Sequence, residues 1–262
     1  MYDLSELRKQ IDDVDANLIT ILLKRFEITS KIGEYKAENG KELFCADREE
    51  EKISCIKKLL SDRPDMPYIA DMFRCAMDFS KYQQSANIYG TKDIYLIGMP
   101  GCGKSTIGKL LSDKMQREFT DIDELFGQVY HMTPAYVIEK FGEAEFRDKE
   151  TELLKNVASK AFEKKKWDTK RGRIISCGGG IVCREENRDI LKNDSLVIYV
   201  KRSLKDLAVN GRPLSEKNGI EALYEQRKDK YSSWCDMEVE NAASPEVCVQ
   251  EILKNIMEQN RK

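Results

Sequence analysis

The chain has 262 residues, which is long enough for one large domain or two domains of ordinary size. Its formal net charge of −2, with charges of both signs spread along the chain, argues against a general nucleic-acid binder. We expect no membrane partner, because no apolar run approaches the ~20 residues of a membrane span. We expect a cytoplasmic location, because no secretory signal opens the chain and eight cysteines without a Cys-x-x-Cys pair favour reduced thiols.

The first predicted element is a long helix that begins after Asp3, a good N-cap residue. Apolar residues recur along it with alternating steps of three and four, and no proline interrupts them before the Asn39-Gly40 pair. Such a helix is roughly 50 Å long, and a domain of about 85 residues cannot bury it alone, so a helical partner is expected. The apolar positions are Leu4, Leu7, Ile11, Val14, Leu18, Ile21, Ile28, Ile32 and Tyr35.

Arg25 interrupts this apolar seam. A guanidinium there must pair with a glutamate within the fold, bind an anionic ligand or extend to solvent. Lys36 follows on almost the same helix face. Arg8 precedes Arg25 by roughly 25 Å of helix, so the two side chains can bind one ligand only if they come from different subunits.

Two more helices are predicted, over residues 49–60 and 68–84, on either side of Pro64 and Pro67. Ser80 and Gln84 lie one turn apart on the same face of the later helix. A three-helix unit that carries basic side chains together with these polar donors suits a small polyanion.

Five motifs occur in order along residues 1–85: Leu7-Arg8, Lys24-Arg25, Gly33-Glu34-Tyr35-Lys36, Asp47-Arg48-Glu49 and Ser80-Lys81-Tyr82-Gln83-Gln84. Through these motifs the segment resembles the all-helical chorismate mutase family. The resemblance implies an intertwined homodimer through the N-terminal helices, conversion of chorismate to prephenate and no cofactor. It implies that Arg25 and Arg8 of the partner subunit hold the two carboxylates, that Lys36 and Gln84 bond the ether oxygen, that Glu49 takes the hydroxyl, and that Arg48 and Ser80 complete the pocket.

The reaction fits these residue types. A [3,3] rearrangement needs a folded substrate and charge placed at the breaking C–O bond, without an acid, a base or a nucleophile. Cys45 stands where many family members have Asp. Together with the long seam, this departure keeps open a second hypothesis, in which residues 1–85 form a dimerisation or effector-binding module without catalysis.

A domain boundary is expected in the turn-prone segment Ser85–Thr91, with residues 86–91 as the linker. Residues 4–84 contain no convincing strand, whereas residues 92–258 alternate strands and helices, so we expect a helical domain over residues 1–85 and a second domain over residues 92–262. This alternation predicts an α/β domain with a parallel sheet.

The segment Gly98-Met99-Pro100-Gly101-Cys102-Gly103-Lys104-Ser105 fits the phosphate-binding loop pattern. It follows a buried-strand pattern at Ile94–Ile97 and precedes a predicted helix over residues 106–115, which is the context that the motif needs. Such a loop binds ATP through backbone N–H groups and the helix N-terminus, with Lys104 on the β- and γ-phosphates and Ser105 on Mg²⁺. The candidate ATP-binding residues are Gly98, Gly101, Cys102, Gly103, Lys104, Ser105 and Thr106. A Gly-rich turn without function is the alternative.

Further candidates follow downstream. Asp121 and Asp123 are expected on the same side of a strand end, where paired carboxylates can serve Mg²⁺ and a hydroxyl substrate. Arg147 lies in a predicted helix and would by default be a surface charge. The predicted strand at 174–176 runs into the triple glycine 178–180, which indicates close backbone approach. Arg212 lies in a loop that can close over phosphates.

Six motifs occur in order along residues 92–260: the phosphate loop, Asp121-Ile122-Asp123, Phe146-Arg147, the triple glycine, Arg212-Pro213-Leu214, and Arg227 followed four residues later by Tyr231. Through these motifs the segment resembles shikimate kinase, a P-loop kinase related to the nucleoside-monophosphate kinases. The resemblance implies transfer of phosphate from Mg²⁺-bound ATP to shikimate. It implies that Lys104 and Arg212 stabilise the transferring phosphoryl group, that Asp121 and Ser105 hold Mg²⁺, and that Asp123 orients or deprotonates the accepting hydroxyl. The implied shikimate-binding residues are Asp123, Arg147, Gly179, Gly180 and Arg227. Another small-metabolite kinase of the same fold is the alternative, and residues 241–245 are a candidate adenine loop.

Overall fold

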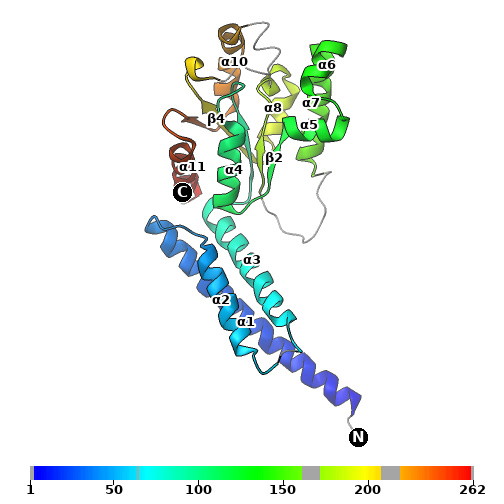
Figure 1. The fold of residues 1–262 in the computed structure, drawn as a ribbon, viewed down its shortest axis with the longest axis vertical. Helices are drawn as coiled ribbons and strands as arrows, with labels where there is room; N and C mark the ends of the chain where they lie inside the picture. Colours follow the sequence, from blue (N-terminus) through cyan, green and yellow to red (C-terminus); the bar gives the residue numbers. More distant parts are fainter. Residues whose placement is uncertain (1–2, 64, 161–171, 208–218, 261–262) are drawn as a thin grey trace. The chain divides into compact units, whose positions relative to one another are not determined.

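The computed structural model describes residues 3–63, 65–160, 172–207 and 219–260 (Figure 1). Contacts within the chain divide it into two compact units, Met1–Ile88 and Tyr89–Lys262. No helix among the described residues is both long and apolar enough to cross a membrane.

The first unit contains three helices, α1 (Leu4–Glu38), α2 (Ala46–Leu59) and α3 (Tyr68–Tyr89). The carboxylate of Asp3 caps α1 by accepting a hydrogen bond from the Ser5 N–H at 3.0 Å. Helix α3 continues five residues beyond its predicted end, so most of the expected linker is helical. Residues 85–89 contain neither proline nor glycine, and the helix ends before Gly90, whose φ of 75° is left-handed.

The apolar residues of the first unit pack only in part. Ile53 and Ile56 of α2 form a small core with Ala70 of α3, and the rings of Phe26 and Phe79 join α1 to α3 at 5.0 Å. The seam residues of α1 are instead between 42% and 65% exposed in the single chain. Because these apolar side chains are exposed in the single chain, we still expect a helical partner to cover them.

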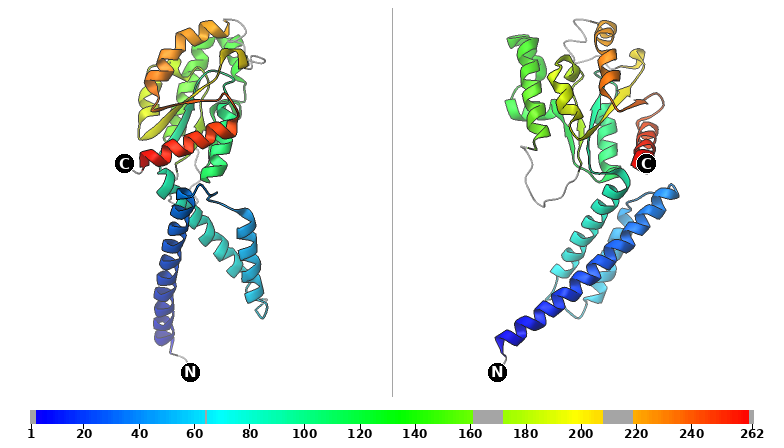
Figure 2. Two further views of the ribbon diagram at one scale, coloured as in Figure 1. Left: turned by 90° about the vertical axis from the view of Figure 1, so that its left-hand side faces the viewer. Right: turned by 180° about the vertical axis from the view of Figure 1, so that it is seen from behind.

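The second unit is built on a five-stranded parallel sheet with the order β2-β3-β1-β4-β5. Helices α4 and α11 cover one face, and α7, α8 and α10 cover the other (Figures 1 and 2). This arrangement confirms the predicted α/β fold. The strands are β1 (Asp93–Ile97), β2 (Phe119–Asp121), β3 (Ile174–Ser176), β4 (Ser195–Lys201) and β5 (Met237–Glu240). The helices are α4 (Lys104–Met115), α5 (Ile122–Tyr130), α6 (Pro134–Phe141), α7 (Glu143–Ala158), α8 (Glu186–Lys192), α10 (Ile220–Trp234) and α11 (Pro245–Asn260), with 3₁₀ turns η1 (Ile181–Cys183) and η2 (Leu204–Asp206).

The strand order explains where a ligand can bind. Strand β1 lies between β3 and β4, and its four apolar residues Ile94–Ile97 are buried. The connection from β1 leads to the β2 edge, whereas the connection from β3 crosses to β4. The carboxyl end of β1 is therefore a topological switch point, where open α/β sheets bind their ligands.

Candidate active sites

The phosphate loop leaves β1 at this switch point and enters α4. Gly98 begins it with a φ of 143°, and a Cβ there would overlap the carbonyl oxygen of Val200 in β4. Gly101 and Gly103 also have positive φ values, of 83° and 102°. Because side chains are strained in that region, the pattern of glycines is a backbone requirement.

Lys104 is the first residue of α4 and is buried. Its ammonium Nζ donates to the carbonyl oxygens of Gly98 and Met99, at 3.0 Å each. The loop therefore folds around its own lysine, which places this cation inside the curve of the loop.

The residues expected to hold a metal lie together. Ser105 Oγ donates to Asp121 Oδ2 at 2.6 Å, and Ser176 Oγ at the end of β3 lies 3.4 Å from the same hydroxyl. Sequence reasoning gave Ser176 no role, although its position before the triple glycine puts it at the carboxyl edge of the sheet. Among the described residues, no group of three or more His, Cys, Asp and Glu residues could hold a metal ion. A hydroxyl and a single carboxylate suit a Mg²⁺ that keeps most of its ligands from water and phosphate.

The expectation for Asp121 and Asp123 on one strand face is wrong. Strand β2 ends at Asp121, and Asp123 lies in the first turn of α5. Asp121 caps that helix, because its Oδ1 accepts hydrogen bonds from the N–H groups of Asp123 at 3.0 Å and Glu124 at 3.4 Å. Aspartate is a strong N-cap residue, and capping ended the strand two residues early.

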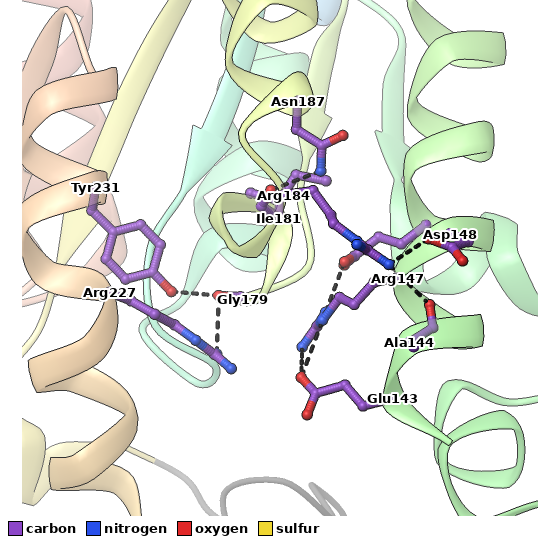
Figure 3. Close-up of polar contacts among 11 residues, drawn as sticks. Glu143, Ala144, Arg147, Asp148, Gly179, Ile181, Arg184, Asn187, Arg227 and Tyr231 are labelled. Carbon is purple, nitrogen blue, oxygen red and sulfur yellow. Dashed lines mark hydrogen bonds and ion pairs between the residues drawn. The ribbon is translucent and has the colours of Figure 1, made fainter. Parts of the chain in front are cut away.

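Arg147 is buried, which corrects the default expectation of a surface charge. Its guanidinium pairs with Glu143 at 3.0 Å (Figure 3) and with Glu150 at 2.7 Å. It also lies over the ring of Phe146. Burial raises the pKa of the Glu150 carboxyl, and the nearby Arg147 opposes the shift. A Cβ on Gly180 would overlap the guanidinium, so Arg147 packs directly against the backbone at the end of the triple glycine.

Arg227 approaches the same glycines from α10. Its Nη1 donates to Gly179 O at 3.2 Å, and the hydroxyl of Tyr231, one turn later, donates to the same oxygen (Figure 3). Gly178 completes the junction, since a Cβ there would lie 3.0 Å from Asp123 Oδ1 and close to Glu150. The structure thus brings Asp123, Arg147 and Arg227 to one loop. Arg212 and its loop lie outside the described residues.

In the first unit, Arg25 contacts Ser80, one of the residues predicted to share its pocket. Its Nη1 donates to Ser80 Oγ at 2.6 Å and to Ala76 O at 2.9 Å. Both acceptors are neutral oxygens, so the contacts of Arg25 within the described part of the chain do not include an internal salt bridge to a glutamate. Burial lowers the pKa of the guanidinium, as expected for a cation held by neutral groups.

Gln84 follows Ser80 by one turn of α3, and Lys36 follows Arg25 by eleven residues along α1. The amide of Gln84 donates to Thr29 O at 2.8 Å, and the side chain packs on Gly33, where a Cβ would lie 2.9 Å from Gln84 Cγ. Lys36 Nζ donates to Leu43 O at 2.7 Å. The sequence pattern Gly33 to Lys36 therefore combines a space for an amide with a nearby cation.

Two predicted residues of this unit form ion pairs that were not predicted, and a third is exposed on α1. Glu49 pairs with Lys81 at 2.9 Å, a partner that sequence reasoning did not assign. Arg48 is exposed and pairs with Glu51. Arg8 is exposed on α1, seventeen residues before Arg25, which is roughly 25 Å of helix. One chain alone does not bring Arg8 to the pocket.

Two family models match the chain in separate stretches. The model described as Shikimate kinase matches residues 100–257, and the model described as Chorismate mutase type II matches residues 7–85. A shikimate kinase of Clostridium botulinum is 37% identical over 171 residues, covering 63% of this chain and 96% of the relative. One of Enterococcus faecalis is 36% identical over 179 residues, covering 64% and 99%.

Solved structures give the same result for the second unit. The shikimate kinase of Acinetobacter baumannii in complex with shikimate superposes with a TM-score of 0.60 at 26% identity, covering 68% of this chain and 99% of that one. The shikimate kinase of Aquifex aeolicus gives a TM-score of 0.53 at 33% identity, covering 64% and 97%. The chain therefore belongs to the shikimate kinase family and carries, in the same polypeptide, a chorismate mutase type II domain ahead of the kinase domain.

Proposed function

We propose that the chain is a bifunctional enzyme that phosphorylates shikimate with ATP to shikimate 3-phosphate and rearranges chorismate to prephenate. The kinase activity belongs to residues 92–262 and the mutase activity to residues 1–85, joined by residues 86–91. All eight cysteines are free thiols, which supports the cytoplasm as the place of both reactions.

The kinase proposal rests most on the meeting of Asp123, Arg147 and Arg227 at the triple glycine, beside a phosphate loop. Two buried guanidiniums provide charge-assisted bonds for a carboxylate substrate. Asp123 then orients the substrate hydroxyl that attacks the γ-phosphorus and accepts its proton as the bond to the β-phosphate oxygen breaks.

The remaining groups manage the phosphate charge. Lys104 and Arg212 stabilise the transferring phosphoryl group, and the loop N–H groups bind the other phosphates. Ser105 and Asp121 form the oxygen donor pair that would hold Mg²⁺, with Ser176 beside them. When bound, Mg²⁺ would supply positive charge that offsets the charge of the phosphates.

The kinase proposal is tested by shikimate-dependent release of ADP from ATP. We expect turnover in the parent protein and a rise of about 10- to 100-fold in the KM for shikimate in Arg147→Ala, because a buried charge-assisted bond is lost. If Arg147→Ala phosphorylates shikimate as well as the parent does, the proposed substrate pocket is wrong.

The mutase proposal rests most on the Arg25–Ser80 contact beside the buried amide of Gln84. These groups, with Lys36, provide fixed positive charge and donors for a dicarboxylate whose ether oxygen gains negative charge in the transition state. Glu49 accepts a hydrogen bond from the substrate hydroxyl. Arg8 lies roughly 25 Å of helix away from Arg25 in the single chain, so the proposed site takes Arg8 from the second subunit of a homodimer. Arg48, which is exposed in the single chain, completes the proposed pocket. The exposed seam of α1 supports that assembly.

The mutase activity is tested by the loss of chorismate absorbance on addition of purified protein. We expect turnover in the parent and a loss of at least about 100-fold in Gln84→Ala, since a donor to the developing oxyanion is removed. No turnover in the parent would instead favour a dimerisation or effector-binding module.

A further inference from the structure

The loop after β5 reaches the phosphate loop through Asn241. The backbone N–H of Asn241 donates to Lys201 O at 2.8 Å, which extends the pairing of β5 with β4 by one residue. The residue is only 4% exposed. Its side chain is therefore held by the sheet at the same carboxyl edge from which the phosphate loop starts.

The amide of Asn241 bonds the middle of that loop. Its Nδ2 donates to Cys102 O at 2.8 Å. The same nitrogen lies against Gly103, where a Cβ would overlap it. Gly103 has a φ of 102°, so both its conformation and this contact require glycine.

This bond fixes the direction of a phosphate-binding N–H group. The carbonyl of Cys102 and the N–H of Gly103 belong to one peptide plane, and in a trans peptide they point in opposite directions. Holding the carbonyl toward Asn241 therefore aims the Gly103 N–H away from it. Gly103 is the N-cap of α4, and N–H groups at this end of a helix have no carbonyl partner within the helix. They are the groups that bind phosphate in such loops.

We propose that Asn241 is a positioning residue for the nucleotide, which aligns the Gly103 N–H with a phosphate oxygen through its bond to Cys102 O. This inference rests on the proposed ATP-dependent kinase activity. It links the loop between β5 and α11 to the phosphate loop through one side chain.

The chain offers a matched control in Asn187. Its Nδ2 also donates to a backbone carbonyl, that of Ile181, at 2.8 Å, and the residue is 1% exposed. Ile181 follows the triple glycine on the substrate side (Figure 3). Asn187→Ala removes a buried amide of the same kind without touching the phosphate loop.

The experiment measures ADP affinity by titration calorimetry, and the KM values for ATP and shikimate, in the parent, Asn241→Ala, Asn241→Asp and Asn187→Ala. Asn241→Asp keeps the shape of the side chain and replaces the donor with an acceptor. We expect both Asn241 variants to weaken ADP binding and raise the KM for ATP by about tenfold, with the KM for shikimate unchanged. Asn187→Ala should leave ADP affinity at the parent value.

Two results would overturn the inference. One is that the parent and both Asn241 variants bind ADP with the same affinity. The other is an equal rise of both KM values in Asn241→Ala and Asn187→Ala with equal losses of Tm, which would show a purely structural role. A parent that neither binds ADP nor turns over ATP would contradict the proposed kinase activity itself, and a low Tm confined to one Asn241 variant leaves the other to decide.

Discussion

Arg147 and Glu150 form an ion pair of 2.7 Å on consecutive turns of α7, with side chains 6% and 2% exposed. Glu150 Oε1 has no hydrogen-bond partner among the described residues, and Asp123 adds a second negative charge nearby. A buried pair with an unsatisfied oxygen is a poor way to stabilise a fold. Its position at the triple glycine suits a guanidinium held ready for a ligand.

The first prediction concerns the pH dependence of this pair. Burial raises the pKa of Glu150, so the folded protein holds this proton more tightly than the unfolded chain does. Its contribution to stability is therefore complete below the ordinary glutamate pKa and decreases as the pH rises through the raised value. Glu150→Gln stays neutral and lacks this loss. Urea unfolding from pH 4.5 to pH 8 should show the parent losing stability relative to Glu150→Gln as the pH increases.

A constant difference between the two proteins across that range would contradict the raised pKa. Both proteins share every other titrating group, so their difference isolates residue 150.

The second prediction concerns Gly180, which leaves space for the Arg147 guanidinium. Gly180→Ala displaces that group and should raise the KM for shikimate roughly tenfold, while the KM for ATP stays near the parent value. Gly127→Ala in α5 is the control, because a Cβ at Gly127 has no neighbour within 4 Å. Steady-state kinetics of both variants provide the measurement. If the KM for shikimate is the same in Gly180→Ala and Gly127→Ala, Gly180 is not part of the substrate pocket.

The third prediction concerns Gly33 and the Gln84 side chain that packs on it. Gly33→Ala should favour the helix by about 1 kcal/mol of propensity, yet it forces Gln84 away. We expect mutase kcat/KM to fall at least about tenfold, with the kinase activity of the same preparation unchanged as the internal control. Full mutase activity in Gly33→Ala would show that this contact has no part in the site.

The fourth prediction concerns the second subunit. Arg8→Ala and Arg25→Ala should each lose mutase activity. In a mixed dimer, one site regains both arginines, because it combines Arg25 of one chain with Arg8 of the other. Statistical mixing after joint refolding then restores about a quarter of the parent activity. A mixture that stays inactive would exclude the shared site. A parent that is a monomer by light scattering and yet has full mutase activity would exclude it as well.

Local patterns predicted much of this molecule. The phosphate loop needs only its own glycines and the flanking strand and helix, all contiguous in sequence. Helix α1 follows from its uninterrupted apolar repeat. The parallel sheet follows from the alternation of apolar runs with amphipathic segments.

Other features depend on competition or on distant contacts. The end of β2 was missed because Asp121 can continue a strand or cap a helix, and the cap prevailed. The burial of Arg147 depends on Gly180, which is 33 residues away in the sequence and becomes its neighbour only in the fold. Asn241 reaches Cys102 across 139 residues, and no local pattern announces that bond.

The most direct test of two active sites in one chain is a crossed assay on single preparations of the parent, Arg147→Ala and Gln84→Ala. Each preparation is assayed for shikimate-dependent ADP release and for loss of chorismate absorbance. We expect both activities in the parent, a fall of only the kinase kcat/KM for shikimate in Arg147→Ala, and loss of only the mutase activity in Gln84→Ala. A parent that lacks either activity, or variants that lose neither activity selectively, would contradict it.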